Sequence, residues 1–397
     1  MSNLNSFMDV TATEFLKRAT TTAEHFGFRD IETLRKDPLC KSCAKKLDHT
    51  AGATQRKTDA LGGMLTGGMH NFCEFKFHEM TKPVLFYTIE QAPRSGEVAL
   101  ALQVFNVEKS IGEAILIQTT RALITDLGYD NHSVRINSVG DRESSGRYIR
   151  ELTNYLRKRV EDMPEVAREL MKEHVMHALL HLIEKEHELA HKTPNPLEYL
   201  SDQSRKHFRE IVEFLDMTAI PYEIDPKLMG HHECYSDALF AIDLLDADGG
   251  KLQNAPISVR GGRYNEFVFR STKKQIAAVG AVVTLKDKKA PSRTTRTRLA
   301  IPSVYVVQLG FGPKIKTLML IDELRLAGIN VHQNLASDSL SIQLRDAEEK
   351  NVKYTVIIGQ KEYVDGTVIL RDMVGRNQEY IPIASLAQKL KRIKQTA

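Results

Sequence analysis

The chain has 397 residues, of which 42% are hydrophobic and 27% are charged, and this composition excludes an intrinsically disordered protein. No apolar run approaches the roughly 18 residues of a membrane-spanning helix, and the first ten residues lack the basic and apolar blocks of a secretory signal. The net charge of +4 permits an RNA or phosphate partner, and four cysteines in so long a chain indicate a reducing, cytoplasmic location.

The first 285 residues carry alternating helical and strand patterns that predict one large domain. The exception is the segment from residue 34 to residue 80, which shows no regular pattern and contains the glycine pairs Gly62-Gly63 and Gly67-Gly68. The predicted helices cover residues 11–26, 111–127, 145–160, 164–191 and 204–217. The predicted strands cover residues 84–89, 98–107, 134–138, 222–224, 237–243 and 256–260.

Residues 286–303 are rich in basic, polar and proline residues and predict a linker. Beyond it, strands and helices alternate to the end of the chain, which predicts a small, mostly parallel or mixed sheet with helices on its faces. The predicted strands are 304–309, 330–333, 354–359, 367–372 and 380–383, and the predicted helices are 314–327, 340–350 and 386–393.

Several short motifs occur in one order along the chain. They are Ile136–Gly140 with Arg147-Tyr148, Asn195–Leu200 with His207-Phe208, Ile220–Ile224 with Leu228-Met229, Gly261-Gly262-Arg263-Tyr264, and the stretch Leu340–Gly359. In order and spacing, this set resembles the histidyl-tRNA synthetase family of class II aminoacyl-tRNA synthetases. The resemblance implies an α+β fold, in which an antiparallel sheet flanked by helices precedes a small α/β anticodon-binding-like domain.

The resemblance also divides the chain. It implies a catalytic-core-like domain over residues 1–285, with a helical insertion at about 160–195 and a segment at 38–80 that could bind zinc. The basic linker at 286–303 then joins this domain to the anticodon-binding-like domain at 304–397. Members of the family work as dimers, so the resemblance implies a homodimer.

The family's catalytic arginines are missing from the matching positions. Adenylation brings a carboxylate against an anionic α-phosphate, and fixed guanidinium groups stabilise that charge. Here Thr88 and Glu97 stand at two arginine positions of the second motif, Gly230 stands at that of the histidine-specific loop, and Asp287 at that of the third motif. The proline of the dimer motif is also absent, at Leu34.

These departures lead to three hypotheses. The first is a non-catalytic synthetase-like protein that does not bind ATP and binds tRNA, another RNA or a protein partner. The second is a histidine-sensing regulatory subunit resembling that of ATP phosphoribosyltransferase. The third is a divergent histidine–tRNA ligase with residual or altered activity.

The resemblance also nominates site residues. Those expected to line the old amino-acid pocket are Glu90, Glu113, His231, His232, Glu233, Tyr235, Arg263 and Tyr264. Those expected to contact RNA are Gln360, Lys361 and Glu362 after a strand, and Arg293, Arg296 and Arg298 in the linker, where basic side chains can follow a phosphate backbone.

Two groups of residues have the chemistry of metal ligands. Cys40, Cys43, His70 and Cys73 have the pair spacings of a structural zinc site, although His49 or His78 could compete and the alternative is unlinked thiols with a surface histidine. His174, His177 and His181 fall on one face of a predicted helix and could bind a transition metal. The alternatives for these three are an ordinary exposed helix face or a tRNA docking surface.

Overall fold

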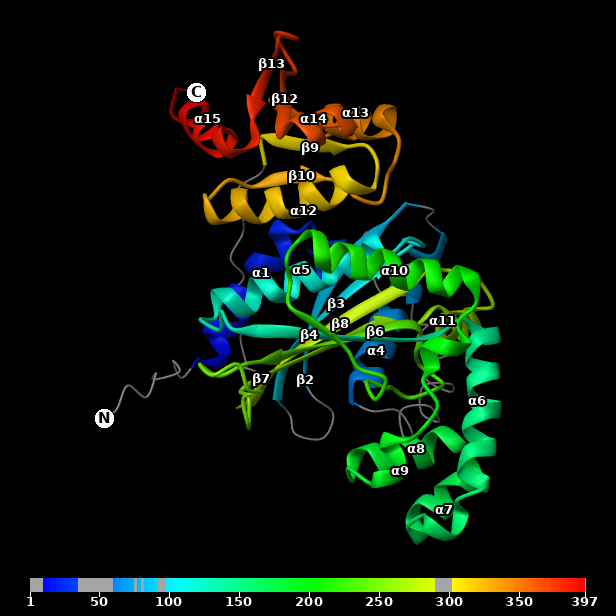
Figure 1. Cartoon of the computed structure of the whole chain (residues 1–397). Helices are drawn as coiled ribbons and strands as arrows, with labels where there is room; N and C mark the ends of the chain where they lie inside the picture. The colour runs from blue at the N-terminus through cyan, green and yellow to red at the C-terminus, as the bar shows by residue number, and fades with distance from the viewer. Residues whose placement is uncertain are drawn as a thin grey trace, which may run out of the picture.

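The computed structural model describes residues 10–34, 60–74, 77–79, 82–91, 97–289 and 302–396, and they form a large sheet, a smaller sheet and the helices around them. This arrangement confirms the α+β fold class (Figure 1). None of the described helices is long and apolar enough to cross a membrane.

The larger sheet contains the strands of the N-terminal domain. Their bounds are β1 (Arg29–Asp30), β2 (Val84–Gln91), β3 (Glu97–Phe105), β4 (His132–Gly140), β5 (Tyr222–Ile224), β6 (Ser236–Leu244), β7 (Ile257–Arg263) and β8 (Ala278–Lys289). They are ordered β1-β2-β3-β8-β7-β6-β4-β5, and all neighbours are antiparallel except the parallel edge pairs β1 with β2 and β4 with β5. Strand β8 was not predicted, and it runs to Lys289, past residue 286 where the linker was predicted to begin.

One face of this sheet is covered by three helices that the sequence predicts. They are α1 (Ala12–His25), α5 (Ile111–Asp126) and α10 (Asp202–Met217). Helix α5 is buried around almost its whole circumference, because α1, α10 and the smaller domain pack on the sides that the sheet leaves open. Figure 1 shows α1 and α5 between the large sheet and the C-terminal domain.

The opposite face of the sheet is covered by α4 (Ala60–Glu74), followed by the short helix η1 (Phe77–Glu79). The prediction of an irregular segment from 34 to 80 is therefore wrong for residues 60–74. Four glycines made this stretch resemble a loop, but in the fold Gly68 permits close helix–sheet contact: a Cβ added there would lie 2.2 Å from Nε2 of Gln103. Tertiary packing outweighs the helix-breaking tendency of about 1 kcal/mol per glycine.

The insertion is a bundle of short helices and not one long helix. Helices α6 (Arg142–Arg157), α7 (Glu165–Glu173), α8 (Val175–Glu184) and α9 (Glu188–His191) pack around their own apolar cluster. The predicted continuous helix from 164 to 191 is wrong because His174 adopts an extended conformation, with φ −160° and ψ 136°, and caps α8. His174 therefore does not share a helical face with His177 and His181.

The C-terminal domain contains a small mixed sheet, as its alternating pattern predicts. Its five strands are ordered β10-β9-β11-β12-β13, an order that was not predicted. Its strands are β9 (Val304–Gln308), β10 (Val331–Gln333), β11 (Tyr354–Ile358), β12 (Thr367–Asp372) and β13 (Gln378–Pro382). Its helices are α12 (Phe311–Leu326), α13 (Leu340–Glu349), α14 (Gln360–Asp365) and α15 (Ile383–Thr396). Helix α14 is not among the helices that the sequence predicts.

Polar contacts join the two domains. Arg325 of α12 pairs with Asp126 at the end of α5 at 2.6 Å, and Lys109 before α5 pairs with Asp338. The side-chain amide of Gln333 donates to the carbonyl of Phe26 after α1. The C-terminal domain is therefore positioned over α1 and α5, on the side of the large sheet opposite α4.

Candidate functional site

The Gly261-Gly262-Arg263-Tyr264 motif lies at the end of β7. Its two glycines allow close packing, and its Arg and Tyr side chains form polar contacts. A Cβ on Gly261 would lie 2.3 Å from Cζ of Phe240, and one on Gly262 would lie 3.0 Å from Cδ1 of Tyr235. Both glycines therefore allow aromatic rings of β6 and the preceding loop to lie directly on β7. The next two side chains then leave the strand on opposite faces of the sheet.

Arg263 points toward α5 and forms a buried ion pair with Glu113. Its Nε donates to Oε1 at 2.7 Å and one terminal nitrogen donates to Oε2 at 2.6 Å, in the bidentate geometry that suits guanidinium and carboxylate. The same guanidinium donates to the carbonyls of Val107 and Lys109. With only 1% of its side chain exposed, Arg263 is fully engaged in holding α5 to β7.

Two further groups extend this pair. Nε2 of His207 on α10 lies 2.9 Å from Oε1 of Glu113, and Asp237 accepts a hydrogen bond from Ser204 at 2.8 Å. Burial alone raises the pKa of Glu113, but the charges and hydrogen bonds of Arg263 and His207 outweigh it and lower this pKa to about 2. Burial raises the pKa of Asp237. Sequence reasoning nominated neither His207 nor Asp237 as site residues.

A second group lies on the opposite face, beneath α4. The hydroxyl of Tyr264 donates to Oε1 of Gln103, and Thr88 donates to Oε1 of Glu90 at 2.8 Å. Burial raises the pKa of Glu90. Oε1 of Glu90 is 3.8 Å from the Cβ position of Gly67, so this carboxyl group faces α4 and not open solvent.

Apolar side chains of α4 are buried against the same face of the sheet. Leu65, Met69 and Phe72 are at most 1% exposed, and the ring of Phe72 stacks on Phe105 with centroids 3.8 Å apart. A Cβ on Gly280 of β8 would lie 2.5 Å from a methyl carbon of Leu65. The helix is therefore in direct contact with the backbone of the sheet.

Gly230 stands at a position where the resemblance implies an arginine, and its neighbours leave no room for one. A Cβ at this position would lie 2.2 Å from Cδ2 and 2.4 Å from Cε2 of Tyr235. The Tyr235 ring, which is 6% exposed, is thereby confined between Gly230 and Gly262. The absence of a side chain at residue 230 is thus a packing requirement of this fold.

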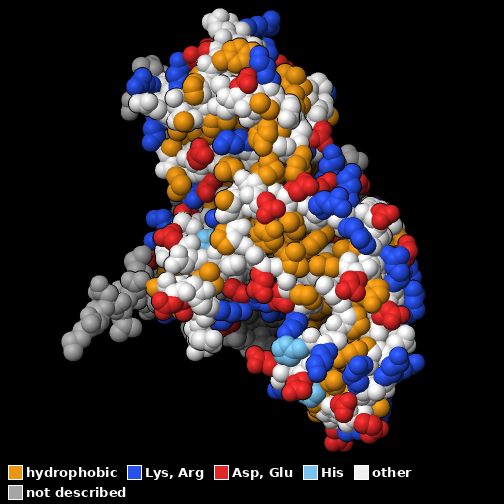
Figure 2. Space-filling view, viewed as in Figure 1, with side chains coloured by type: hydrophobic (Ala, Val, Ile, Leu, Met, Phe, Trp, Pro, Cys, Tyr) orange, Lys and Arg blue, Asp and Glu red, His pale blue; other side chains and the backbone are white. Residues whose placement is uncertain are grey.

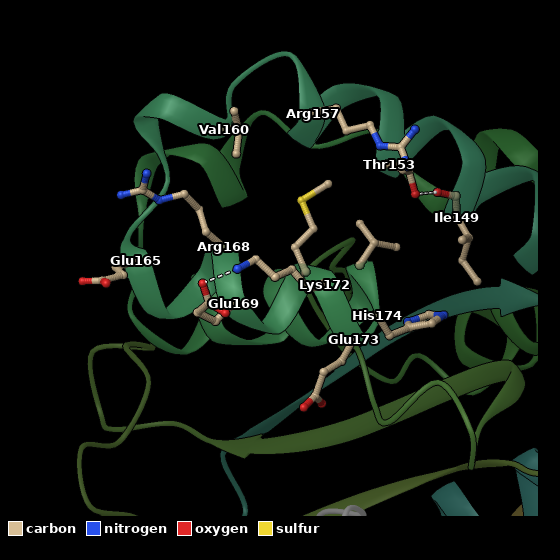
Figure 3. Close-up of a pocket in the computed structure, with 12 residues that line it drawn as sticks. Ile149, Thr153, Arg157, Val160, Glu165, Arg168, Glu169, Lys172, Glu173 and His174 are labelled. Carbon is tan, nitrogen blue, oxygen red and sulfur yellow. Dashed lines mark hydrogen bonds and ion pairs between the residues drawn. The ribbon is translucent and has the colours of Figure 1, made fainter.

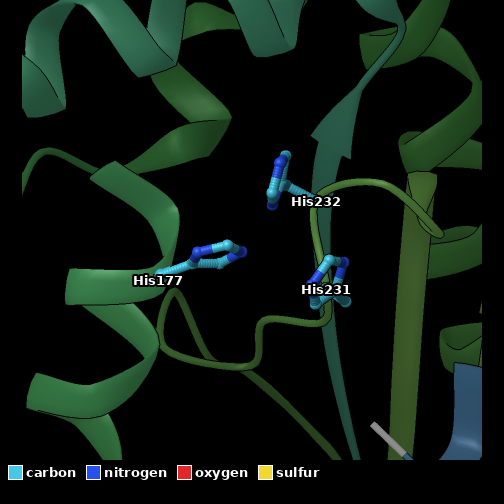
Figure 4. A group of neighbouring side chains, drawn as sticks. All are labelled: His177, His231 and His232. Atoms are coloured by element: carbon cyan, nitrogen blue, oxygen red, sulfur yellow. The ribbon is translucent and has the colours of Figure 1, made fainter. Parts of the chain in front are cut away.

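The third group joins the loop before β6 to the insertion (Figure 4). His231 and His232 lie beside His177 of α8, with ring centroids 5.3 and 5.0 Å from it, and His174 stacks on His232 at 3.7 Å. Burial and the neighbouring rings lower the pKa of His232 to about 3. Glu233 joins the group through its backbone, which donates to Nδ1 of His231.

A hollow of about 730 Å³ opens between α6 and α7, beside His174 (Figure 3). Its wall contains basic and acidic side chains, and Nζ of Lys172 donates to Oε1 of Glu169 at 2.6 Å. This mixture of paired charges and apolar side chains such as Ile149 and Val160 does not select one class of ligand.

The residues nominated for one amino-acid pocket thus lie in three groups. Glu113 and Arg263 form the buried pair, Glu90, Tyr235 and Tyr264 lie toward α4, and His231, His232 and Glu233 face the insertion. Gln103 and the insertion histidines are neighbours that residue-by-residue matching did not include. No local sequence signal predicts that α4 and α8 would reach these positions.

Of the residues predicted to bind metal or RNA, some lie within the described part of the chain and others do not. Cys40, Cys43, Arg293, Arg296 and Arg298 lie outside the described residues. His70 and Cys73 lie three positions apart on α4, with Cys73 buried, so the zinc site stays a prediction. Gln360 and Lys361 are exposed on α14, whereas the Glu362 carboxylate accepts a hydrogen bond from the Gly359 N–H and stabilises the start of that helix.

Replacing Glu113 by Gln should destabilise the chain by about 3–5 kcal/mol, because the Arg263 charge would stay buried without its counterion. Urea denaturation followed by circular dichroism measures the change. Glu213→Gln, on the exposed side of α10, is the matched control and should change stability by less than about 0.5 kcal/mol.

The difference in stability between the wild type and Glu113→Gln should depend on pH. Because the folded-state pKa of Glu113 is lowered from 4.5 to about 2, its stabilising contribution is present above about pH 4.5 and is lost as the pH falls toward 2. The stability difference between the wild type and Glu113→Gln should therefore shrink over this interval. A difference that stays constant with pH would contradict the role given to the carboxylate.

Gly230→Arg, which introduces the arginine that the resemblance implies at this position, should destabilise the chain by about 1–3 kcal/mol through overpacking against Tyr235. The control is Gly146→Arg on α6, where a Cβ meets no atom within 4 Å and loss of a helical glycine should be neutral or stabilising. Equal thermal midpoints for Gly230→Arg and the wild type would show that the loop has room for this side chain.

Comparison with known proteins identifies the C-terminal domain and several related proteins. Residues 303–393 match the family model described as "Anticodon binding domain". The histidine–tRNA ligase of Geobacillus sp. (strain WCH70) is 26% identical over 339 residues, which cover 81% of this chain and 79% of that protein. The histidine–tRNA ligase of Lactiplantibacillus plantarum is 25% identical, and the match covers 81% of this chain and 78% of that protein. The apo histidyl-tRNA synthetase of S. aureus is a structural neighbour, with a TM-score of 0.45, 16% identity and coverage of 82% and 81%. The motif order, the anticodon-binding domain and these ligases together show that the chain belongs to the histidyl-tRNA synthetase-like class II family.

Proposed function

We propose that this chain is a non-catalytic member of its family that does not activate histidine with ATP and that binds tRNA or another RNA through its C-terminal domain. The observation that carries the first part is the packing of α4 on the large sheet. Leu65, Met69 and Phe72 are buried against the strands that also present Thr88 and Glu90.

Charge supports the same proposal. The family stabilises phosphate with arginines, whereas here Thr88 and Gly230 occupy two of those positions. Arg263 is already neutralised by Glu113 on the α5 side. A carboxyl group at Glu90, whose pKa burial raises, offers a triphosphate no positive charge. Activation of an amino acid would need guanidinium groups held beside the phosphates.

The retained C-terminal domain supports an RNA partner. Tyr380 on β13 is 65% exposed, and Nζ of Lys361 on α14 lies 6.0 Å from the centre of its ring. An exposed aromatic ring can stack on an unpaired base, and a lysine beside it can contact the adjoining phosphate. We call Gln360, Lys361 and Tyr380 the β13 surface.

The electrostatic character of the surface favours local recognition. Figure 2 shows Lys and Arg side chains interspersed with Asp and Glu over the visible face, in keeping with a net charge of only +4. RNA affinity then depends on a few stacking and phosphate contacts, and not on a broad basic field. By analogy with its family, the chain would act as a homodimer in the cytoplasm, and a protein could be its partner in place of RNA.

The test separates stacking from charge at the β13 surface. Fluorescence anisotropy would measure binding of a labelled tRNA-His transcript by the full chain at several salt concentrations. Tyr380→Ala should lower affinity by about tenfold, since stacking of one base contributes roughly 1–3 kcal/mol, and should leave the salt dependence unchanged. Lys361→Ala should reduce the slope of log K against log salt by about 0.7, the value for one phosphate of a single strand.

Lys274→Ala, an exposed lysine after α11 (Asn265–Thr272), is the control and should change neither quantity. If tRNA-His and unrelated RNAs fail to bind, or if all three variants bind as the wild type does, the RNA proposal is wrong. A thermal shift on adding histidine, without RNA binding, would instead support the histidine-sensing alternative.

A further inference from the structure

We propose that His177, His231 and His232 form a binding site for one divalent transition-metal ion of the zinc type, which links the helical insertion to the loop before β6. This proposal is independent of RNA binding and of catalytic activity. It concerns a different set of residues from the predicted Cys40, Cys43, His70 and Cys73 site.

The geometry brings the three side chains together from distant parts of the chain. One ring nitrogen from each of the three histidines lies within 4.8 Å of the other two (Figure 4). Zinc–nitrogen bonds of about 2.0–2.1 Å place the nitrogens of a tetrahedral site about 3.3 Å apart. The nitrogens would therefore have to approach one another by at most about 1.5 Å, a change within reach of rotation about the side-chain torsions.

Two of the potential donor atoms are buried and lack a hydrogen bond. Nε2 of His177 and Nδ1 of His232 have no partner among the residues that the structure describes. A buried polar atom left without a partner costs free energy, so such atoms in a folded protein indicate a missing water, ion or ligand. Because both nitrogens belong to the same cluster, a single cation would satisfy them together.

The surroundings of the cluster orient its rings. Oε2 of Glu173 lies 3.6 Å from Nδ1 of His177, on the opposite side of the ring from Nε2. A carboxylate in that position fixes the ring and strengthens the other nitrogen as a metal ligand. His174 stacks on His232 with an angle of 5° between the ring planes, which holds the second ligand in place.

Charges near the cluster act in both directions. Arg270 donates to the backbone carbonyl of Glu233 and brings a positive charge toward His232, which opposes a bound cation. The carboxylate of Glu173 beside His177 and that of Glu233, which acts on His174, offset this charge. The balance permits a dication held by neutral imidazole ligands.

The donor set determines the class of metal. Imidazole nitrogens favour zinc, cobalt, nickel and copper, whereas magnesium and calcium prefer oxygen ligands. Three protein ligands leave a fourth tetrahedral position for a solvent molecule. Since α8 and the loop at 230–235 are distant in sequence, the ion would act as a cross-link between insertion and sheet.

Cobalt is the probe, because tetrahedral Co²⁺ absorbs visible light and thiolate ligation adds a separate near-ultraviolet band. The full chain would carry Cys40→Ser and Cys43→Ser, so that the predicted zinc site does not contribute. One equivalent of Co²⁺ should produce the visible bands without the thiolate band, and one equivalent of Zn²⁺ should abolish them. His177→Ala and His232→Ala should each lower affinity at least 100-fold, and Glu173→Gln about tenfold.

His181→Ala, on the same helix outside the cluster, is the matched control and should keep wild-type affinity. Circular dichroism and melting in EDTA check that each variant folds, and only proteins with an intact cluster should gain thermal stability on adding Zn²⁺. The proposal is overturned if Co²⁺ gives no visible bands, if the bands survive in both His177→Ala and His232→Ala, or if they carry a thiolate signature.

Discussion

The contact between α4 and the large sheet is the constraint on which the rest of the N-terminal domain depends. A helix can lie this close to a sheet only where small residues occupy the contact on both elements. Here Gly68 of α4 contacts Gln103, and Gly280 of β8 contacts Leu65. Once Phe72 has stacked on Phe105, the helix is buried in an apolar cluster with Phe86 and Val282. The polar residues of this face then bond with each other, as Thr88 does with Glu90.

The buried ion pair has a complementary role on the other face. A bidentate bond between Arg263 and Glu113, supported by His207, fixes α5 and α10 to the end of β7. This arrangement stabilises the fold only while both charges are present, because either one alone would be buried without compensation. The motif that identifies the family thus serves structure in this chain, and its guanidinium is not available to a phosphate.

The sequence predicted the C-terminal domain well and the covered sheet face poorly, for identifiable reasons. From Val304 onward, the alternation of apolar strands with amphipathic helices is local, and the fold follows it closely. The helix at 60–74 depends on packing between glycines and a distant strand, which no local pattern encodes. His174 similarly interrupts a run of good helix formers, and its extended conformation brings α8 to His231 and His232.

The site predictions illustrate the same limit. Matching residues one by one against the family put Glu113 and Arg263 in the same pocket without predicting a contact, and in the structure the two form a buried ion pair. It also put Glu90 and His232 in that pocket. In the structure Glu90 faces α4, and His232 lies beside His177 of the insertion. The resemblance implied a helical insertion but not where its helices would lie, and the segment that contains α4 shows no regular sequence pattern.

Histidine-dependent exchange of pyrophosphate into ATP most directly tests whether the packing of α4 on the large sheet prevents the activation of histidine by ATP. Loss of one charge-stabilising donor costs roughly 10²–10³ in rate, so replacement of arginine at four positions should place exchange at least about 10⁴-fold below an active histidine–tRNA ligase assayed in parallel. Our account predicts no histidine-dependent signal above the protein-free control. Exchange at a rate near that of the active ligase would contradict it, and would mean that α4 leaves the sheet to admit ATP.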